Sequence, residues 1–432
     1  MIWNESKECM SREQMHDLQS KRLRKLVSTV YHNTPFYRRK MQEMDITPDD
    51  IRSIDDIVKL PFTTKQDLRD NYPFGLQAVP TSEIVRIHAS SGTTGNPTIV
   101  GYTRHDLEIW QESIARCLTA YGITRNDIFS VGYGYGLFTG GLGAHYGAEY
   151  VGATVIPTST GNTEKHVRLI RDLGITGIAC TPSYALYLAE TIEKMGIDPQ
   201  MLKLRVGMFG AEPWTENMRK EIESRLHLSA YNCYGLSEIM GPGVAHECEC
   251  KNGSHILEDH YYPEIISPET LQPLPFGQTG ELVFTTLTKE GMPLLRYRTK
   301  DLTSLIEGIC DCGRTNVRMT RIVGRSDDML IIRGINVFPS QVESVILDMP
   351  EFEPQYLLVV DRINLDTLQV QVEVRRDFFS DELSAMLALK KRLADRLKSV
   401  LTVGADVKLM EPNSIQRSEG KSKRVIDKRN IE

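Results

Sequence analysis

The chain has 432 residues, of which 41% are hydrophobic, and a formal net charge of −6 from 51 basic and 57 acidic side chains. This composition is typical of a globular protein and excludes a disordered chain. The length predicts roughly two to four domains, or one large domain with a small one. The charge gives no indication of a nucleic-acid or membrane partner. The sequence begins without a charged and then apolar leader, so we expect a cytoplasmic protein.

The predicted elements begin with a helix over residues 11–31, where apolar side chains recur at steps near three and four. Short capped helices are predicted over 47–73. Between residues 104 and 230, short apolar runs bounded by Gly or Pro alternate with amphipathic helices. This alternation predicts an α/β fold with a mostly parallel sheet covered by helices. The uncharged, glycine-rich segment 128–148 is interpreted as a loop-rich wall and not as a membrane helix.

The pattern changes in the last third of the chain. Residues 278–332 resemble hairpins, and beyond residue 334 the order is helix, strand, strand, helix, strand. That order predicts a small α+β domain. We place the boundary near the sequence GRSDDM, which gives an N-terminal domain over 1–326 and a C-terminal domain over 327–432.

The first motif with chemical meaning is SSGTTGNPT, at Ser90–Thr98. Its glycines allow backbone N–H groups to turn toward an anion, and its hydroxyls add donors, so polyphosphate is a natural ligand. It lacks the Gly-Lys-Ser/Thr ending of a Walker loop, and a strand is predicted to follow it. Taken alone, the same residues also fit a polar hairpin turn.

Four further motifs follow, each ambiguous by itself. In YNCYGLSEIMGPG, Tyr234 can stack on a base and Glu238 can bind Mg2+, although a turn with a helix-capping Ser-Glu pair also fits. In YRTKDL, Asp301 can accept bonds from a ribose diol or cap a turn. In GRSDDM, Arg325 is a fork-shaped donor for an anion. The basic tail RSEGKSKRVIDKR is either a solvated charge run or the source of a mobile cation, Lys421.

In this order and at these distances, the motifs resemble those of the adenylate-forming acyl-CoA synthetases, and within them the phenylacetate–CoA ligases. The resemblance includes YGYGLFTGGLGAHYGAEY and covers nearly the whole chain. It implies a large α/β N-terminal domain and a small, mobile α+β C-terminal domain. It also implies an AMP-forming ligase that converts phenylacetate or a similar aryl acid, ATP and CoA into aryl-acyl-CoA, AMP and pyrophosphate through an acyl-adenylate. Relatives are often dimers, so a homodimer is implied as well.

Two alternatives remain open. The same activation can be followed by transfer of the acyl group to a carrier-protein thiol. A hypothesis of another class is a scaffold without catalytic activity that senses nucleotide or binds metal. The presence of Glu238, Asp301 and Lys421 argues against it.

The resemblance assigns roles to individual residues. Lys421 and Glu238 would be catalytic, with Mg2+ on Glu238, and Asp327 would be the hinge between the domains. The implied nucleotide-binding set is Ser90, Ser91, Gly92, Thr93, Thr94, Gly95, Gly210, Ala211, Glu212, Pro213, Tyr234, Gly235, Ser237, Asp301 and Arg325. The chain departs from the family at Asn96 and Thr98, where lysines are common, so one positive charge near the phosphates is expected to be missing.

The candidate acid pocket lies in segment 128–148. Tyr133, Tyr135 and Phe138 offer aromatic surface, and the neighbouring glycines leave room for a ring. Ordinary core packing is the competing interpretation of these three side chains.

Two Cys-x-Cys pairs, Cys248/Cys250 and Cys310/Cys312, are accompanied by His255. Without a secretory context such pairs favour a metal over disulfides. On an extended strand both thiols of a pair face one side, so they can converge on structural Zn2+. The four ligands would be either both pairs or Cys248, His255, Cys310 and Cys312, and reduced thiols without metal are the alternative.

Overall fold

The computed structural model describes residues 1–90, 97–327, 330–333, 335–362, 366–380, 382–418 and 422–429. The chain divides into two compact units, each with a hydrophobic core of its own. The first comprises Met1–Thr181, Gln200–Ala211 and Leu228–Ile322, and the second comprises Pro182–Pro199, Glu212–His227 and Val323–Glu432. None of the helices in these described ranges is both long and apolar enough to cross a membrane.

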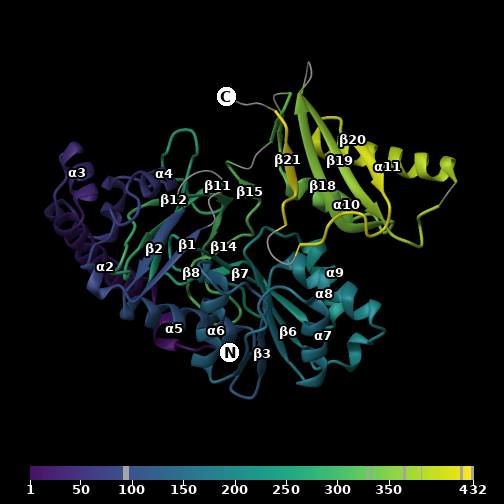
Figure 1. The fold of residues 1–432 in the computed structure, drawn as a ribbon. Helices are drawn as coiled ribbons and strands as arrows, with labels where there is room; N and C mark the ends of the chain where they lie inside the picture. The colour runs from purple at the N-terminus through teal and green to yellow at the C-terminus, as the bar shows by residue number, and fades with distance from the viewer. Residues whose placement is uncertain are drawn as a thin grey trace. The chain divides into compact units, whose positions relative to one another are not determined.

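The first unit contains a nine-stranded sheet (Figure 1). Five strands that neighbour one another run parallel, in the order β4 (Thr154–Ile156), β3 (Ile128–Val131), β5 (Gly177–Cys180), β6 (Val206–Gly210) and β7 (Ser229–Leu236). Antiparallel strands continue the sheet as β8 (Gly241–His246), β9 (Ser254–Ile256), β14 (Arg318–Met319) and β13 (Leu305–Ile306). Strands β5 and β6 are buried at every position, which explains their uninterrupted apolar sequences. The predicted α/β fold is confirmed.

Some of the helices near the N-terminus begin at a side-chain cap, as predicted for the short helices over 47–73 and observed at Thr64. The predicted helix over 11–31 is α2, which starts after Ser11, and Ser11 forms a capping box with Gln14. The helices up to residue 120 are α1 (Glu5–Glu8), α2 (Arg12–Asn33), α3 (Pro35–Glu43), α4 (Lys65–Asp70) and α5 (Arg104–Ala120). Short 3-10 helices lie at Pro48–Asp50, Ile54–Lys59, Thr81–Glu83 and Pro199–Met201.

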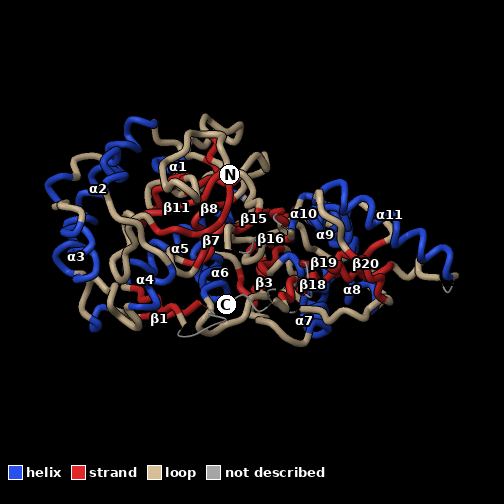
Figure 2. The backbone as a smooth tube through the Cα atoms, turned by 90° about the horizontal axis from the view of Figure 1, so that it is seen from above, coloured by secondary structure: helices blue, strands red, loops and turns tan. Residues whose placement is uncertain are grey.

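Helix α6 (Thr139–Val151) corrects the prediction for segment 128–148, and α7 (Thr163–Asp172) follows it. The loop-rich interpretation is wrong for the second half of that segment, which is helical. Gly143 and Gly147 lie one turn apart, and a Cβ atom on them would come within 2.5 Å of Trp110 and 2.1 Å of Ile114, both on α5. These glycines therefore permit the close packing of α5 and α6, which lie side by side in the views of both Figure 1 and Figure 2.

Two antiparallel sheets complete the first unit. Strands β1 (Arg86–Ser90) and β2 (Thr98–Tyr102) form a hairpin. Strands β10 (Tyr261–Ile266), β11 (Gly280–Thr286) and β12 (Tyr297–Thr303) pair in sequence order. The hairpin pattern after residue 278 predicts the pairing of β11 with β12, whereas β10 was not predicted.

The second unit contains the predicted helix–strand–strand–helix–strand order. Its elements in that order are α10 (Pro339–Leu347), β18 (Phe352–Arg362), β19 (Asp366–Val374), α11 (Leu383–Leu401) and β20 (Asp406–Met410). A strand that the sequence did not indicate, β21 (Val425–Asp427), adds to the sheet parallel to β18. The unit also includes α8 (Pro182–Lys194), α9 (Glu216–Leu226), β15 (Gly324–Arg325), β16 (Leu330–Ile332) and β17 (Ile335–Val337).

Candidate active site and metal centre

Part of the predicted nucleotide site, namely Ser91, Gly92, Thr93, Thr94, Gly95 and Lys421, lies outside the described residues. Ser90 and Thr98 flank the loop as directly paired residues of β1 and β2, so a strand does follow the loop. Their hydroxyl oxygens are buried and have no hydrogen-bond partner among the described residues. Because an unpaired buried hydroxyl costs free energy, both groups suit a ligand bound at this loop.

Tyr234 and Asp301 are brought together from different sheets. Tyr234 lies on β7 and Asp301 on β12, and the Tyr234 hydroxyl donates to Asp301 Oδ2 at 2.5 Å. Gly235 follows on β7, where a Cβ atom would lie 1.9 Å from the Gly241 carbonyl oxygen, so only glycine fits. An aromatic ring beside a fixed carboxylate is the arrangement expected for a nucleoside.

Glu238 lies in the turn between β7 and β8 and is 5% exposed. The preceding Ser237 exchanges a hydrogen bond with Thr139 at 3.0 Å between hydroxyl oxygens. The Lys65 Nζ atom lies 3.3 Å from Glu238 Oε1. A buried carboxylate beside a cation fits the predicted role of a residue that holds Mg2+ near phosphates.

Two lysines near Glu238 were missed by sequence reasoning. Lys65 is the first residue of α4, where a positive charge is unfavourable for the helix dipole, and that position was the available signal. Lys289 is buried, donates to the carbonyl oxygens of Glu238 at 3.0 Å and Ile239 at 2.7 Å, and lies over the Tyr102 ring. Burial lowers the pKa of Lys289 to about 8. Lys65 therefore provides a positive charge beside Glu238.

The predicted adenine-binding segment 210–213 has an unusual backbone at its first two residues. A Cβ atom on Gly210 would lie 2.2 Å from the Cys233 carbonyl oxygen, and Ala211 has a left-handed φ of 72°. The Glu212 carboxylate accepts from the backbone N–H groups of Ser183 at 2.7 Å and Ser422 at 3.0 Å. Glu212 thus binds protein backbone in this structure, and Pro213 follows it in the chain.

The three aromatic residues of the candidate acid pocket lie between β3 and α6. Tyr133 and Phe138 make an edge contact with ring centroids 6.5 Å apart, and the Tyr133 hydroxyl donates to the Cys180 carbonyl oxygen at 2.7 Å. The Tyr135 hydroxyl lies 3.1 Å from His145 Nδ1. Tyr133 is buried and the other two are partly buried, so both packing and ligand contact are compatible with this group.

Arg325 and Asp327 pair with each other. The guanidinium Nε and Nη2 atoms of Arg325 donate to the two carboxylate oxygens of Asp327 at 3.0 and 3.1 Å. The predicted anion donor and the predicted hinge residue are therefore joined by an ion pair across two positions of the chain.

Four of the five predicted metal ligands converge. The donor atoms of Cys248, His255, Cys310 and Cys312 all lie within 4.8 Å of one another, whereas Cys250 is not part of this group. Cys248 Sγ is 3.8 Å from Cys310 Sγ, and Cys312 Sγ is 3.5 Å from His255 Nε2. Three thiols and one imidazole at such distances fit the tetrahedral preference of Zn2+.

The convergence arises from turns and not from the extended strands that the sequence analysis assumed. Lys251 N–H donates to the Cys248 carbonyl oxygen, and Gly313 N–H donates to the Cys310 carbonyl oxygen, each closing a turn. Gly313 has a left-handed φ of 90°, as such a turn requires. The third element is β9, which supplies His255 and lies between β8 and β14 in the sheet.

A buried arginine borders this cluster. Arg314 donates to Cys312 Sγ at 3.5 Å and forms a 2.6 Å ion pair with Glu8, and both charged side chains are fully buried. Glu8 in turn accepts from the backbone N–H of Asn4 at 2.8 Å. The cluster is thereby connected to the N-terminal residues of the chain.

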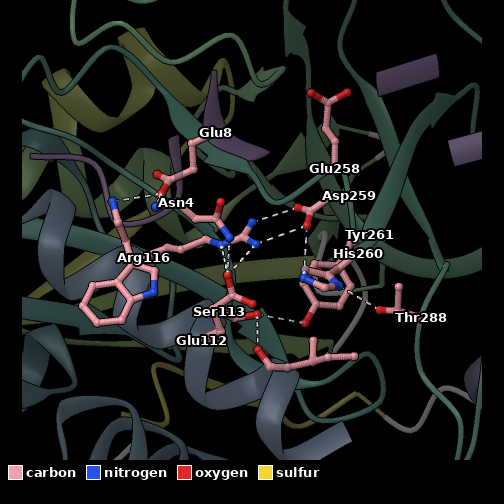
Figure 3. Close-up of polar contacts among 12 residues, drawn as sticks. Asn4, Glu8, Glu112, Ser113, Arg116, Glu258, Asp259, His260, Tyr261 and Thr288 are labelled. Atoms are coloured by element: carbon pink, nitrogen blue, oxygen red, sulfur yellow. Dashed lines mark hydrogen bonds and ion pairs between the residues drawn. The ribbon is translucent and has the colours of Figure 1, made fainter. Parts of the chain in front are cut away.

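The polar contacts continue into the core of the first unit (Figure 3). Asn4 donates to Glu112, Glu112 pairs with Arg116 at 2.9 Å, and Arg116 pairs with Asp259 at 2.8 Å. Burial opposes the ionised form of Asp259, but the charges of His260 and Arg116 outweigh it and hold the pKa of Asp259 well below its usual range. Buried charges paired in this way are costly to separate, so the network fixes the N-terminal residues against the core.

Two family models match this chain. A model described as AMP-binding enzyme matches residues 9–287, which is more than half of the chain, and a model described as AMP-binding enzyme C-terminal domain matches residues 334–429. The class of protein is therefore that of the AMP-binding enzymes, the adenylate-forming superfamily.

Full-length relatives narrow the class. The chain is 51% identical to the phenylacetate-coenzyme A ligase of Thermus thermophilus over 99% of this chain and 100% of that protein. It is 53% identical to the phenylacetate-coenzyme A ligase of Escherichia coli over 98% and 97%. A crystal structure of 2-hydroxyisobutyryl-CoA ligase in the postadenylation state matches with a TM-score of 0.93 and 30% identity, over 99% of this chain and 92% of that chain. The chain belongs to the phenylacetate–coenzyme A ligase family, which confirms the resemblance seen in the motifs.

Proposed function

We propose that this chain is an AMP-forming acid–thiol ligase that joins phenylacetate, or a similar aryl acid, to CoA using ATP. The observation that supports it most strongly is the near full-length identity to phenylacetate-coenzyme A ligases. In the first half-reaction the acid's carboxylate oxygen attacks the α-phosphate of ATP, and pyrophosphate leaves. In the second half-reaction the thiol of CoA attacks the acyl carbon of the acyl-adenylate, AMP leaves, and the thiol proton is released.

In this proposal the nucleotide lies between the loop Ser90–Gly95 and the end of β7. The loop donates N–H groups and hydroxyls to the phosphates, Tyr234 contacts the adenine, and Asp301 accepts from the ribose hydroxyls. Segment 210–213 forms the rest of the adenine slot, and Arg325 contacts ribose or phosphate. The 2.5 Å contact between Tyr234 and Asp301 supports a common role for these two residues.

Two anions must approach each other in the first half-reaction, so positive charge is required where they meet. Glu238 would hold Mg2+, which when bound supplies positive charge to the phosphates. Lys65, 3.3 Å from Glu238, and Lys421 supply the protein's own cations. Lys289 donates hydrogen bonds to the carbonyl oxygens of Glu238 and Ile239 and so fixes the backbone of this turn.

Two other segments would bind the acid and allow the domain movement. Tyr133, Tyr135 and Phe138 would contact the aromatic ring of the acid. We place the boundary of the mobile C-terminal domain between residues 326 and 327, and a rotation about Asp327 would replace Lys421 by the pantetheine arm of CoA for the second half-reaction.

The proposed reaction is tested with a panel of aryl and alkyl acids supplied with ATP and CoA, with AMP release as the readout. We expect AMP release that requires CoA and is fastest with phenylacetate. AMP release that requires an added carrier protein would favour the alternative thiol acceptor, a chemistry named for a 26% identical relative, fatty acid–[acyl-carrier-protein] ligase ScoC. Absence of AMP with every acid would favour a nucleotide-binding or metal-binding scaffold.

We also propose that Cys248, His255, Cys310 and Cys312 bind structural Zn2+. Their mutual distances, within 4.8 Å, and the three-sulfur, one-nitrogen donor set support this assignment. Metal analysis of protein purified without added metal is the test, and about one equivalent of zinc per chain is expected. Less than about half an equivalent would contradict the proposal.

The proposed dimer follows from the resemblance alone. We propose a cytoplasmic homodimer whose partners are the aryl acid and CoA, with no nucleic acid and no membrane. Light scattering of the purified enzyme tests the dimer, because a mass near 48.9 kDa would identify a monomer.

A further inference from the structure

The described residues on the N-terminal side of Lys421 are fixed through Arg417. Its guanidinium forms a bidentate pair with Glu373, at 2.7 and 2.9 Å, and its Nε atom donates to Glu190 at 2.9 Å. The Glu373 side chain is fully buried, the Glu190 side chain is 8% exposed and the Arg417 side chain is 11% exposed. An arginine shared by two buried carboxylates in this way is held strongly.

The residues on the C-terminal side of Lys421 are fixed as well. The backbone N–H of Ser422 donates to Glu212 Oε2 at 3.0 Å. Arg424 lies over the Tyr356 ring, 4.5 Å from its centroid, and donates to the Ser183 hydroxyl at 3.4 Å. Both ends of the short stretch that contains Lys421 are thus bonded to the body of the second unit.

These partners come from two different parts of the chain. Glu373 and Tyr356 lie in the region matched by the C-terminal family model, residues 334–429. Glu190, Ser183 and Glu212 lie in the region matched by the AMP-binding model, residues 9–287. The pair between Arg417 and Glu373 would survive any movement of one region against the other, whereas the bonds to Glu190 and Glu212 would break.

We propose that Glu190 and Glu212 are positioning residues for the first half-reaction. Their carboxylates hold Arg417 and Ser422, and so fix the chain on both sides of Lys421 while the acyl-adenylate forms. Releasing these two bonds is a condition for the second half-reaction, in which Lys421 has no role. This inference rests on the proposed function, because it requires Lys421 to be the catalytic lysine.

Glu190→Gln tests the inference because it removes the charge and keeps the size of the side chain. Adenylation is measured by pyrophosphate exchange, and thioester formation is measured by supplying preformed acyl-adenylate and CoA to the same preparation. We expect adenylation to fall about tenfold, as for the loss of one charge-assisted hydrogen bond, and thioester formation to change less than about twofold. The ratio of the two rates does not depend on how much of the protein is folded. An equal loss in both steps, or no loss in adenylation, would overturn the proposal.

Glu193→Gln is the matched control. Glu193 lies on the same helix, α8, and pairs with Arg225 at 2.7 Å instead of with the segment around Lys421. We expect neither half-reaction to change. A loss of adenylation equal to that of Glu190→Gln would attribute the effect to α8 in general and overturn the proposal.

A double-variant cycle shows whether Glu190 acts through Lys421. If it does, Glu190→Gln causes no further loss of adenylation in a Lys421→Ala background. A further tenfold loss in that background would overturn the inference and leave the proposed function standing. Near-normal adenylation in Lys421→Ala alone would instead reject the role of Lys421 in the proposed function, so the two failures are distinguishable.

Discussion

The cysteine–histidine cluster and the surroundings of Glu238 are both suited to a cation, but their charged groups are arranged differently. In the cluster, four donor atoms from two turns and a strand lie within 4.8 Å of one another. Around Glu238, the carboxylate faces Lys65 at 3.3 Å, and Asp301 accepts a bond from Tyr234. In the cluster the fold alone brings the four donor atoms together, whereas Glu238 and Asp301 are each paired with a protein side chain. We therefore expect changes in the cluster to affect stability and changes near Glu238 to affect rate.

The largest effect is expected for Lys421→Ala. Adenylation should fall about 10²–10³-fold, because a well-placed positive donor at the reacting phosphate is lost, while ATP binding stays nearly intact. Pyrophosphate exchange measures the rate, and equilibrium titration with ATP measures binding. A pyrophosphate-exchange rate near that of the unmodified enzyme would contradict the catalytic role of Lys421.

Cys312→Ser is the corresponding test of the cluster. We expect loss of bound zinc and a melting temperature lower by several degrees, since about 1 kcal/mol corresponds to roughly 2–4 °C in a unit of this size. The adenylation rate per folded molecule should be unchanged well below the melting temperature. Zinc analysis, calorimetry and pyrophosphate exchange on one preparation give the three readouts.

Cys250→Ser is a matched control for that substitution. Cys250 belongs to the other Cys-x-Cys pair but is not part of the converging group. Cys250 and Cys312 are both partly buried, so the two substitutions are comparable. Its zinc content and melting temperature should be unchanged. If Cys250→Ser loses zinc as Cys312→Ser does, then the four ligands are not the ones that the structure brings together.

A smaller change in rate is expected for Lys65→Ala. Its side chain is 40% exposed, so solvent screens its charge, and we expect adenylation to fall about tenfold instead of a hundredfold. Lys59→Ala is the control, because the 50% exposed Lys59 side chain pairs with Asp56 at 2.7 Å and not with Glu238. Equal rates for both variants would mean that the charge of Lys65 does not contribute to adenylation.

The sequence predicts the fold well because burial leaves a direct pattern. Strands β5 and β6 are apolar throughout since every position is buried, and the alternation with helices then defines the sheet. Segment 128–148 was predicted incorrectly because glycines suggest loops, whereas Gly143 and Gly147 serve helix packing. Strand β21 was missed because its three residues lie within a charged tail and pair with the distant β18.

The sites were predictable only in part. Spacing limited the zinc ligands to two sets but could not choose between them, because the choice depends on where β9 places His255 relative to two turns. The pairs between Lys65 and Glu238 and between Arg417 and Glu190 join residues far apart in the chain. No local pattern encodes such pairs, since only tertiary packing brings their partners together.

The last prediction concerns His166, which belongs to neither site and so gives the baseline for any loss of stability in acid. His166 is buried, its Nε2 atom lies 2.7 Å from the Ser130 hydroxyl oxygen, and burial lowers its pKa to about 4 from 6.5. His166 is therefore protonated near pH 6.5 in the unfolded chain but only near pH 4 in the folded chain. The contribution of His166 to stability is complete above about pH 6.5 and is lost as the pH falls through this window, by up to about 1.4 kcal/mol per pH unit. Urea unfolding between about pH 4.5 and pH 7.5 should show a shallower acid slope for His166→Gln than for the exposed control His105→Gln. Identical slopes would mean that His166 is not the source, and acid instability would then have to be assigned to other buried groups, His255 of the cluster among them.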